Sequence, residues 1–180
     1  MLIRVILITF FINSCFADSK TGFIGLDLRP NKGKTEISRR QGHFTVAYFL
    51  SSGCPCSQAH FDHLNQLQKD FGKKFQFIGF HSSRSIKIKK ARQYFAQFDI
   101  DFPIINDPEL VYANQFKALK TPHIFVVSPS GEVVFQGGAT DSRNPKRAKN
   151  FYLKTALEQI SRGHQVTLAR AKTLGCYIQR

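Results

Sequence analysis

The sequence predicts a single α/β domain in which helices flank a central mixed sheet. Apolar runs of strand length alternate with segments whose apolar residues recur every three or four positions, and a Pro-Ser-Gly turn separates two further apolar runs. Strands joined by helices pair in parallel, whereas strands joined by a tight turn pair antiparallel. Together these patterns predict a mixed sheet covered by helices.

The first predicted strand runs directly into the first predicted helix. Residues 43–50, HFTVAYFL, read as a buried strand, and residues 57–71 carry apolar side chains at helical spacing before Gly72 ends the pattern. Cys54 and Cys56 lie at the junction, in the sequence SSGCPCS. Open α/β sheets place their sites at such carboxyl ends of strands.

The later elements continue the alternation. We expect a strand over 75–80, a basic helix over 86–98, a short strand over 102–105, a helix over 108–116, a hairpin of strands 124–128 and 132–136, and a closing helix over 148–161. The tail from residue 166 to residue 180 has no strong period.

The N-terminal segment, residues 1–17, has the pattern of a secretory signal, because one arginine precedes a short apolar run with no acidic residue. Cleavage after Ala17 fits it, and so does lipid attachment at Cys15, which follows an imperfect bacterial lipobox. We therefore expect an exported bacterial protein, either periplasmic or anchored in the membrane as a lipoprotein. The predicted organisation is a signal over 1–17, an N-terminal extension over 18–42, the α/β domain over 43–163 and a tail over 164–180.

The chain is strongly basic, with 26 Lys and Arg against 12 Asp and Glu and a formal net charge of +14. These cations are spread along the sequence, and the densest cluster, residues 84–92, opens the expected basic helix. Nucleic-acid binding would require basic residues interleaved with aromatic ones in a known module, which the sequence lacks. We expect no nucleic-acid partner, whereas an anionic surface or an acidic partner fits the charge.

Three cysteines remain if the signal is cleaved: Cys54, Cys56 and Cys176. Cysteines of exported proteins tend to be paired or catalytic, and an odd number favours a reactive thiol. Pro55 suits the first helical position, which makes Cys54 the N-cap residue. Free N–H groups and the helix dipole would then favour the Cys54 thiolate, the nucleophilic form. Cys56, inside the first turn, gains less, and a direct Cys54–Cys56 bond would be strained and easily reduced.

Four motifs carry a family resemblance. They are Cys54-Pro55 with Ser51 three residues ahead, the segment KTPHIFVV over 120–127, the polar loop through Gly138, Asp141 and Arg143, and the ending GCYI over 175–178. In these motifs the chain resembles the thioredoxin-like superfamily, and within it the peroxiredoxin-like redoxins related to alkyl hydroperoxide reductase and thiol-specific antioxidant proteins.

The resemblance implies a thioredoxin fold with Cys54 as the attacking thiol. It also implies that Thr121 and a cis Pro122 lie opposite Cys54, and that Cys176 on the tail is a resolving thiol. The sequence departs from the family patterns at two positions. Ser57 stands where thioredoxins have their second cysteine, and Ala47 stands where peroxiredoxins have a proline. Arg143 is the candidate arginine partner of the thiolate.

Two other classes of function compete with redox chemistry. Cys54, Cys56, His60 and His63 form a candidate copper or zinc site, since positions 56, 60 and 63 share a helix face. The other alternative is a non-catalytic adaptor that docks through its positive surface. His81 follows the second predicted strand and His123 follows Pro122, so both are candidates to face Cys54 and either to lower its pKa or to shuttle a proton.

The leading interpretation is an exported thiol oxidoreductase that needs no bound cofactor. The Cys54 thiolate would attack a peroxide or a disulfide, and Cys176 or Cys56 would resolve the intermediate. A thiol reductant or a protein dithiol partner would then return the enzyme to its reduced state.

Overall fold

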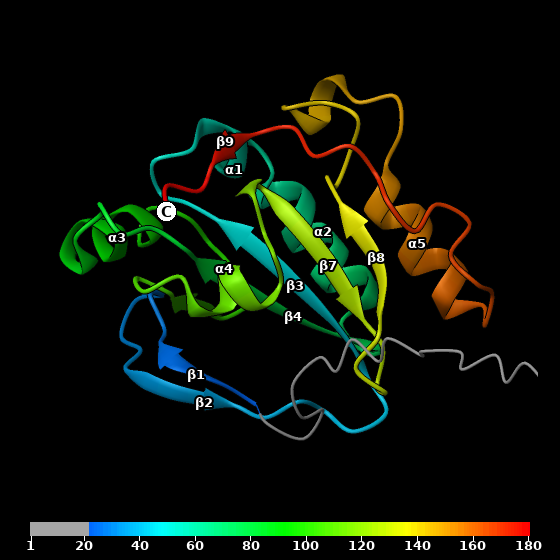
Figure 1. The fold of residues 1–180 in the computed structure, drawn as a ribbon, viewed down its shortest axis with the longest axis horizontal. Helices are drawn as coiled ribbons and strands as arrows, with labels where there is room; N and C mark the ends of the chain where they lie inside the picture. The colour runs from blue at the N-terminus through cyan, green and yellow to red at the C-terminus, as the bar shows by residue number, and fades with distance from the viewer. Residues whose placement is uncertain (1–21) are drawn as a thin grey trace, which may run out of the picture.

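The computed structural model describes residues 22–180, and the expected signal segment lies outside them. A five-stranded mixed sheet forms the centre of the domain, in the order β5-β4-β3-β7-β8 (Figure 1). Its strands are β3 (Phe44–Leu50), β4 (Phe75–His81), β5 (Ile104–Asn106), β7 (His123–Val127) and β8 (Val133–Gly137). The pairs β3–β4 and β4–β5 are parallel, whereas β7 runs antiparallel to both β3 and β8. The mixed sheet flanked by helices confirms the predicted fold class.

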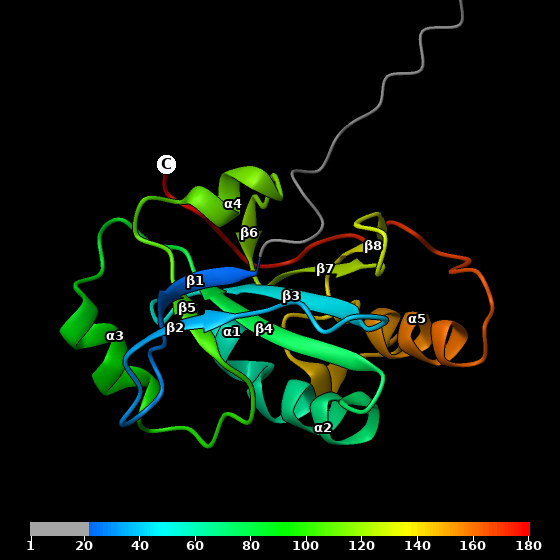
Figure 2. The ribbon, with the colours of Figure 1, turned by 90° about the horizontal axis from the view of Figure 1, so that it is seen from below.

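Helices cover both faces of the sheet (Figure 2). They are α1 (Pro55–Ala59), α2 (Phe61–Phe71), α3 (Ile88–Phe95), α4 (Val111–Gln115) and α5 (Tyr152–Ser161), with a 3-10 turn η1 at Pro145–Arg147. Successive residues of β3 enter opposite cores. Val46 and Tyr48 pack in the core with α2, α3 and α5, whereas Ala47 and Phe49 pack in the core with α4. Because both faces of this strand are buried, its carboxyl end is firmly placed.

All four predicted helices differ from the structure in their bounds, and the basic helix expected over 86–98 spans Ile88–Phe95. The helix with its apolar pattern over 57–71 begins at Pro55, as the predicted cap at Cys54 requires, but it is interrupted at His60, which separates α1 from α2. The helix expected from residue 108 begins only at Val111, because Leu110 adopts a left-handed conformation with φ 58°. The closing helix begins at Tyr152, after the separate turn η1.

Two pairs of strands were not predicted. In the N-terminal extension, β1 (Phe23–Leu26) and β2 (Lys34–Ile37) form an antiparallel hairpin. The second pair joins β6 (Lys120–Thr121) to β9 (Cys176–Tyr177), also antiparallel. The second pair brings the end of the chain to the junction between β3 and α1, where β9 lies above α1 in Figure 1.

The C-terminal tail follows the edge of the domain and is anchored at two places. The backbone of Gln136 in β8 receives one hydrogen bond from Ala171 and donates one to Ala169, each 2.9 Å long. Beyond β9, the Ile178 N–H donates to the Leu119 carbonyl at 3.0 Å, and the Ile178 side chain is buried in the α4 core. A tail without sequence periodicity therefore still has a defined path.

Within residues 22–180, no helix combines the length and the apolar character that crossing a membrane requires.

Candidate functional site

Cys54 lies just after the carboxyl end of β3, at the start of α1. Its backbone is extended, with φ −112° and ψ 109°, it occupies the N-cap position, and Pro55 follows in the first helical turn. The turn before it is closed by the Cys54 N–H donating to the Ser51 carbonyl at 3.1 Å. The structure thus places Cys54 at the predicted helix cap, where the residue is only 1% exposed.

The peptide between Thr121 and Pro122 lies opposite Cys54 and is cis. The Cys54 Sγ is 2.9 Å from the Thr121 carbonyl oxygen. A carbonyl only accepts hydrogen bonds, so this contact serves the thiol form of Cys54. The structure therefore brings Thr121 and Pro122 to the sulfur, the arrangement that the family resemblance implied.

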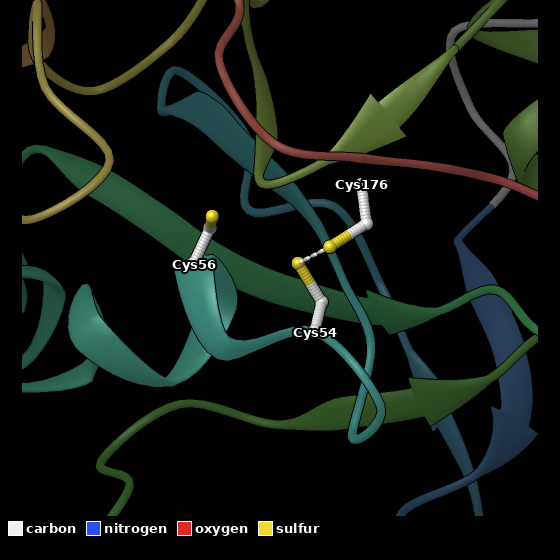
Figure 3. A group of neighbouring side chains, drawn as sticks. All are labelled: Cys54, Cys56 and Cys176. Carbon is white, nitrogen blue, oxygen red and sulfur yellow. Dashed lines mark hydrogen bonds between the residues drawn. The ribbon is translucent and has the colours of Figure 1, made fainter.

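Cys176 comes to the same place from the other end of the chain. In the pairing of β6 with β9, Cys176 lies directly opposite Thr121. Figure 3 shows the Cys54 and Cys176 side chains pointing toward each other, and their Sγ atoms are 2.7 Å apart. Both are free thiols. A covalent sulfur–sulfur bond is about 2.05 Å long, so a small movement brings these two atoms to bonding distance.

Cys56 adds a third sulfur from the first turn of α1 (Figure 3). The Sγ atoms of Cys54, Cys56 and Cys176 all lie within 4.8 Å of one another. Cys54 is buried, whereas the other two are partly exposed. The site is therefore a cluster of three thiols, with its most buried sulfur in contact with the tail.

The Cys54 thiol is acidified. Burial alone would raise its pKa, but hydrogen bonds from the side chains of Cys176 and Thr121 and from the backbones of Cys176 and Ser57 lower the pKa to about 7. Donors to a sulfur stabilise its negative charge and so favour the thiolate. At neutral pH a large fraction of Cys54 is therefore in the nucleophilic form.

The other two thiols shift in the opposite direction. Burial, the hydrogen bond to Cys54 and the charges of Cys54 and Cys56 together raise the pKa of Cys176 to about 12. Burial and the neighbouring Cys54 also raise the pKa of Cys56, although the positive charge of Arg143 opposes them. The cluster thus contains one acidic thiol and two that stay protonated at neutral pH. Arg143, the candidate partner of Cys54, acts on Cys56.

The histidines of the predicted metal site do not join the cluster. In the described part of the chain, the group of side chains close enough to share a metal ion consists of the three cysteines alone. His60 is buried, with its Nδ1 2.7 Å from the Cys56 carbonyl oxygen and its Nε2 3.5 Å from the Thr140 hydroxyl. The His63 ring packs against Phe151, with the ring centres 5.4 Å apart. The His60 imidazole thus serves local hydrogen bonding, and the His63 imidazole serves packing.

The other two candidate histidines support the site from outside. Nε2 of the buried His81 is 3.0 Å from the Ser52 hydroxyl in the turn before Cys54. The Leu119 N–H donates to Nδ1 of His123 at 3.3 Å, which fixes the backbone before Thr121. Burial lowers the pKa of each imidazole to about 4. Both rings are therefore neutral at pH 7, and they position the loops that carry the site.

A small cavity of about 160 Å³ adjoins Cys54 and Cys176. Three serines that follow β4 contribute to its wall: Ser82, Ser83 and Ser85. We had not predicted their role. The sequence contained this information, because the segment SSRS over 82–85 directly follows β4, the strand next to β3. The carboxyl ends of parallel neighbours meet at one edge of the sheet.

Comparisons with known proteins place this arrangement in context. The family model described as thioredoxin-like matches residues 42–133, a range that includes Cys54 and Pro122 and ends before Cys176. A search of curated protein sequences found no match.

Solved structures resemble the fold over most of the chain. A crystal structure of an uncharacterised conserved protein from Geobacillus kaustophilus has a TM-score of 0.77 at 18% identity and covers 93% of this chain and 94% of its own. A hypothetical protein from Sinorhizobium meliloti has a TM-score of 0.74 at 18% identity, covering 90% and 94%. A secreted disulfide oxidoreductase from Mycobacterium tuberculosis has a TM-score of 0.55 at 17% identity, covering 81% and 96%. At these identities the likeness shows a common thioredoxin fold.

Proposed function

Because the chain belongs to the thioredoxin-like family, we propose that it is a thiol–disulfide oxidoreductase whose redox couple is Cys54 and Cys176. One observation carries the proposal: an acidic Cys54 thiol lies 2.7 Å from the sulfur of a second cysteine that comes from the tail. The couple differs from a pair within one helical turn, because Ser57 occupies the position three residues after Cys54.

The reaction proceeds by two exchanges. The Cys54 thiolate attacks one sulfur of a substrate disulfide, forms a mixed disulfide and releases the other substrate sulfur as a thiolate. The Cys176 sulfur, after losing its proton to solvent, then attacks the Cys54 sulfur. This step forms the Cys54–Cys176 disulfide and releases the second substrate thiolate, which takes up a proton. A thiol reductant or a protein dithiol returns the enzyme to its reduced form.

The unequal pKa values support this order of events. In the reduced enzyme Cys54 carries the negative charge, and that charge helps to keep Cys176 protonated. Once Cys54 is bound in a mixed disulfide it has no charge, so this contribution to the Cys176 pKa disappears. The resolving thiol therefore becomes easier to ionise at the step that needs it, without a cofactor.

The adjoining cavity supports peroxide as a second candidate oxidant. Cys54 is 1% exposed beneath the tail, so a protein disulfide reaches it only if the tail moves, whereas a molecule as small as hydrogen peroxide fits a cavity of about 160 Å³. The thiolate would attack one peroxide oxygen, giving a sulfenic acid and hydroxide. The Cys176 thiol would then displace water to form the same disulfide.

The place of action that we propose is outside the cytoplasm, with residues 1–17 as the export signal and lipid attachment at Cys15 as an alternative ending of that signal. The pattern of residues 1–17 supports this, and the structural relative from Mycobacterium tuberculosis is itself described as secreted. Disulfides form and persist in such compartments.

Peptide mass mapping of the reduced protein, after one equivalent of glutathione disulfide or hydrogen peroxide, tests the proposal. We expect a Cys54–Cys176 disulfide, loss of reaction at the site in Cys54→Ser, and accumulation of a mixed disulfide or sulfenic acid at Cys54 in Cys176→Ser. The ratio of the two rates identifies the preferred oxidant. Full turnover by Cys54→Ser, or a Cys54–Cys56 product in the wild type, would contradict the proposed couple.

A further inference from the structure

Cys56 is the member of the cluster that the proposed redox couple does not use. Its sulfur lies within 4.8 Å of those of both Cys54 and Cys176, although the two-step exchange needs only two sulfurs. The three thiols come from two separate segments of chain, the first turn of α1 and strand β9. Convergence of three soft ligands at one point is the basic requirement of a soft-metal site.

We propose that the fully reduced protein binds one Cu(I) ion through the sulfurs of Cys54, Cys56 and Cys176. Thiolates select soft ions such as Cu(I) and Zn(II). Structural zinc is almost always held by four ligands, and in the described residues the group of potential metal ligands at this site stops at three. An all-sulfur set of three therefore favours Cu(I). In this proposed ligand set Cys176 takes the place of His60 and His63, which the helical spacing of the sequence had suggested as ligands.

The framework needs one adjustment to hold the ion. With metal–sulfur distances of about 2.3 Å, sulfurs at the corners of a triangle around a metal are about 4 Å apart. The upper limit of 4.8 Å fits this spacing, whereas Cys54 and Cys176, at 2.7 Å, must separate by about 1.3 Å. Cys54 is fixed by the helix cap and the core, so the movement falls to Cys176 on the partly exposed β9.

The surroundings offset the negative charge that three thiolates would carry around a monovalent ion. Arg143 lies close enough to Cys56 to lower its pKa. The Ser57 backbone N–H, which donates to the Cys54 carbonyl at 3.0 Å, also favours the negative charge on the Cys54 sulfur. Binding releases the protons of the coordinating thiols, so affinity for Cu(I) rises with pH.

Metal binding and disulfide formation exclude each other, because both use the sulfurs of Cys54 and Cys176. A bound Cu(I) ion would block alkylation of all three cysteines. Oxidation to the Cys54–Cys176 disulfide would remove two of three ligands and release the ion. The cluster would thus hold copper only in its reduced state.

Anaerobic titration of the fully reduced protein with Cu(I), in competition with bicinchoninate, tests the site. We expect one equivalent to bind, and serine at any one of the three cysteine positions to weaken binding by more than about 100-fold, since losing even a group that supports a ligand costs 10- to 100-fold. His63→Asn is the matched control and is expected to bind like the wild type. X-ray absorption at the copper edge of the wild-type complex should show three sulfurs and no nitrogen.

Each contrary result is specific. If Cys56→Ser bound Cu(I) as tightly as the wild type, or if the copper spectrum showed only two sulfurs, the ligands would be Cys54 and Cys176 alone. Either result would overturn the proposal. Loss of binding in His63→Asn or nitrogen in the spectrum would restore the histidine set instead. Binding of Zn(II) but not Cu(I) would also overturn it. The spectrum of the wild type decides the matter even if a variant fails to fold. Disulfide formation, measured separately without metal, tests the redox function on its own.

Discussion

Thr121 and Cys176 face each other in a two-residue antiparallel pair, so the strand that precedes the cis proline also holds the tail cysteine against Cys54. Backbone pairing thus fixes the position of Cys176, as the helix cap fixes the position of Cys54. The position of each sulfur depends on the main chain, and the two meet without help from a long or flexible side chain.

The tail strand tolerates no side chain before Cys176. A Cβ on Gly175 would overlap the Thr121 carbonyl, so Gly175→Ala should push β9 away from β6 and move Cys176 from Cys54. We expect the rate of Cys54–Cys176 disulfide formation to fall at least about tenfold, because a displacement of 1 Å in a reactive geometry costs up to 100-fold. Gly33→Ala is the control, since nothing lies within 4 Å of its Cβ position. Equal rates in the two variants would show that β9 is not held by this contact.

The three thiols should ionise in a fixed order. The pKa of Cys54 is lowered to about 7, whereas those of Cys56 and Cys176 are raised, the latter to about 12. Alkylation of Cys54 by iodoacetamide should therefore rise as the pH increases through 7 and then level off, while the other two react only in more alkaline solution. Mass mapping after timed quenching measures each rate. Faster labelling of Cys176 than of Cys54 at pH 7 would reverse the assignment of the nucleophile.

His81 should make the fold sensitive to acid. Its folded pKa is lowered to about 4 by burial, below the value of an unfolded histidine. Between pH 6.5 and 4 the unfolded chain therefore binds the extra proton, and stability present at neutral pH is lost as the pH falls, by at most about 3 kcal/mol.

Urea unfolding at pH 7 and pH 5 measures this loss. His81→Gln should reduce the difference between the two free energies of unfolding, because glutamine does not titrate, while His123 keeps its own contribution. The exposed His164, replaced in the same way, should leave the difference as it is in the wild type. An undiminished difference in His81→Gln would assign the acid sensitivity to other groups.

Asp107 should stabilise the loop that forms the cavity wall. Its buried carboxylate accepts hydrogen bonds from the Ser82 hydroxyl at 2.7 Å and from the backbone N–H groups of Tyr112 and Ala113 at 3.2 and 3.0 Å. Asp107→Ala leaves three donors without this acceptor, and we expect it to lower the free energy of unfolding by about 2–4 kcal/mol. Asp99→Ala, at an exposed position, should change it by less than about 0.5 kcal/mol. Similar free energies of unfolding for Asp107→Ala and Asp99→Ala would show that Asp107 does not stabilise this loop.

The junction at Cys54 could be read from sequence because its signals are local. The buried strand, the turn and Pro55 after the cysteine each act over a few residues, and together they place Cys54 at a helix cap. The same is true of the hairpin formed by β7 and β8.

The parts that were missed depend on distant partners. Two residues of β9 have no periodicity, and their partner β6 lies more than fifty positions earlier in the chain. The break at His60 was missed because the apolar residues at helical spacing, Phe61, Leu64, Leu67 and Phe71, all follow it. Helical spacing also grouped His60 with the cysteines, whereas burial directs its ring nitrogens to the Cys56 carbonyl and Thr140.

Cys54 and Cys176 are 122 positions apart, so a bond between them would turn most of the domain into a closed ring. In the chain-entropy model, closing a loop of this length stabilises the folded state by about 5 kcal/mol. Folding and disulfide formation are thermodynamically coupled, so each favours the other. The disulfide would therefore be easier to reduce in the unfolded protein than in the folded one. The protein would therefore be most robust when it carries oxidising equivalents. Passing them to a partner would leave it both reduced and easier to unfold.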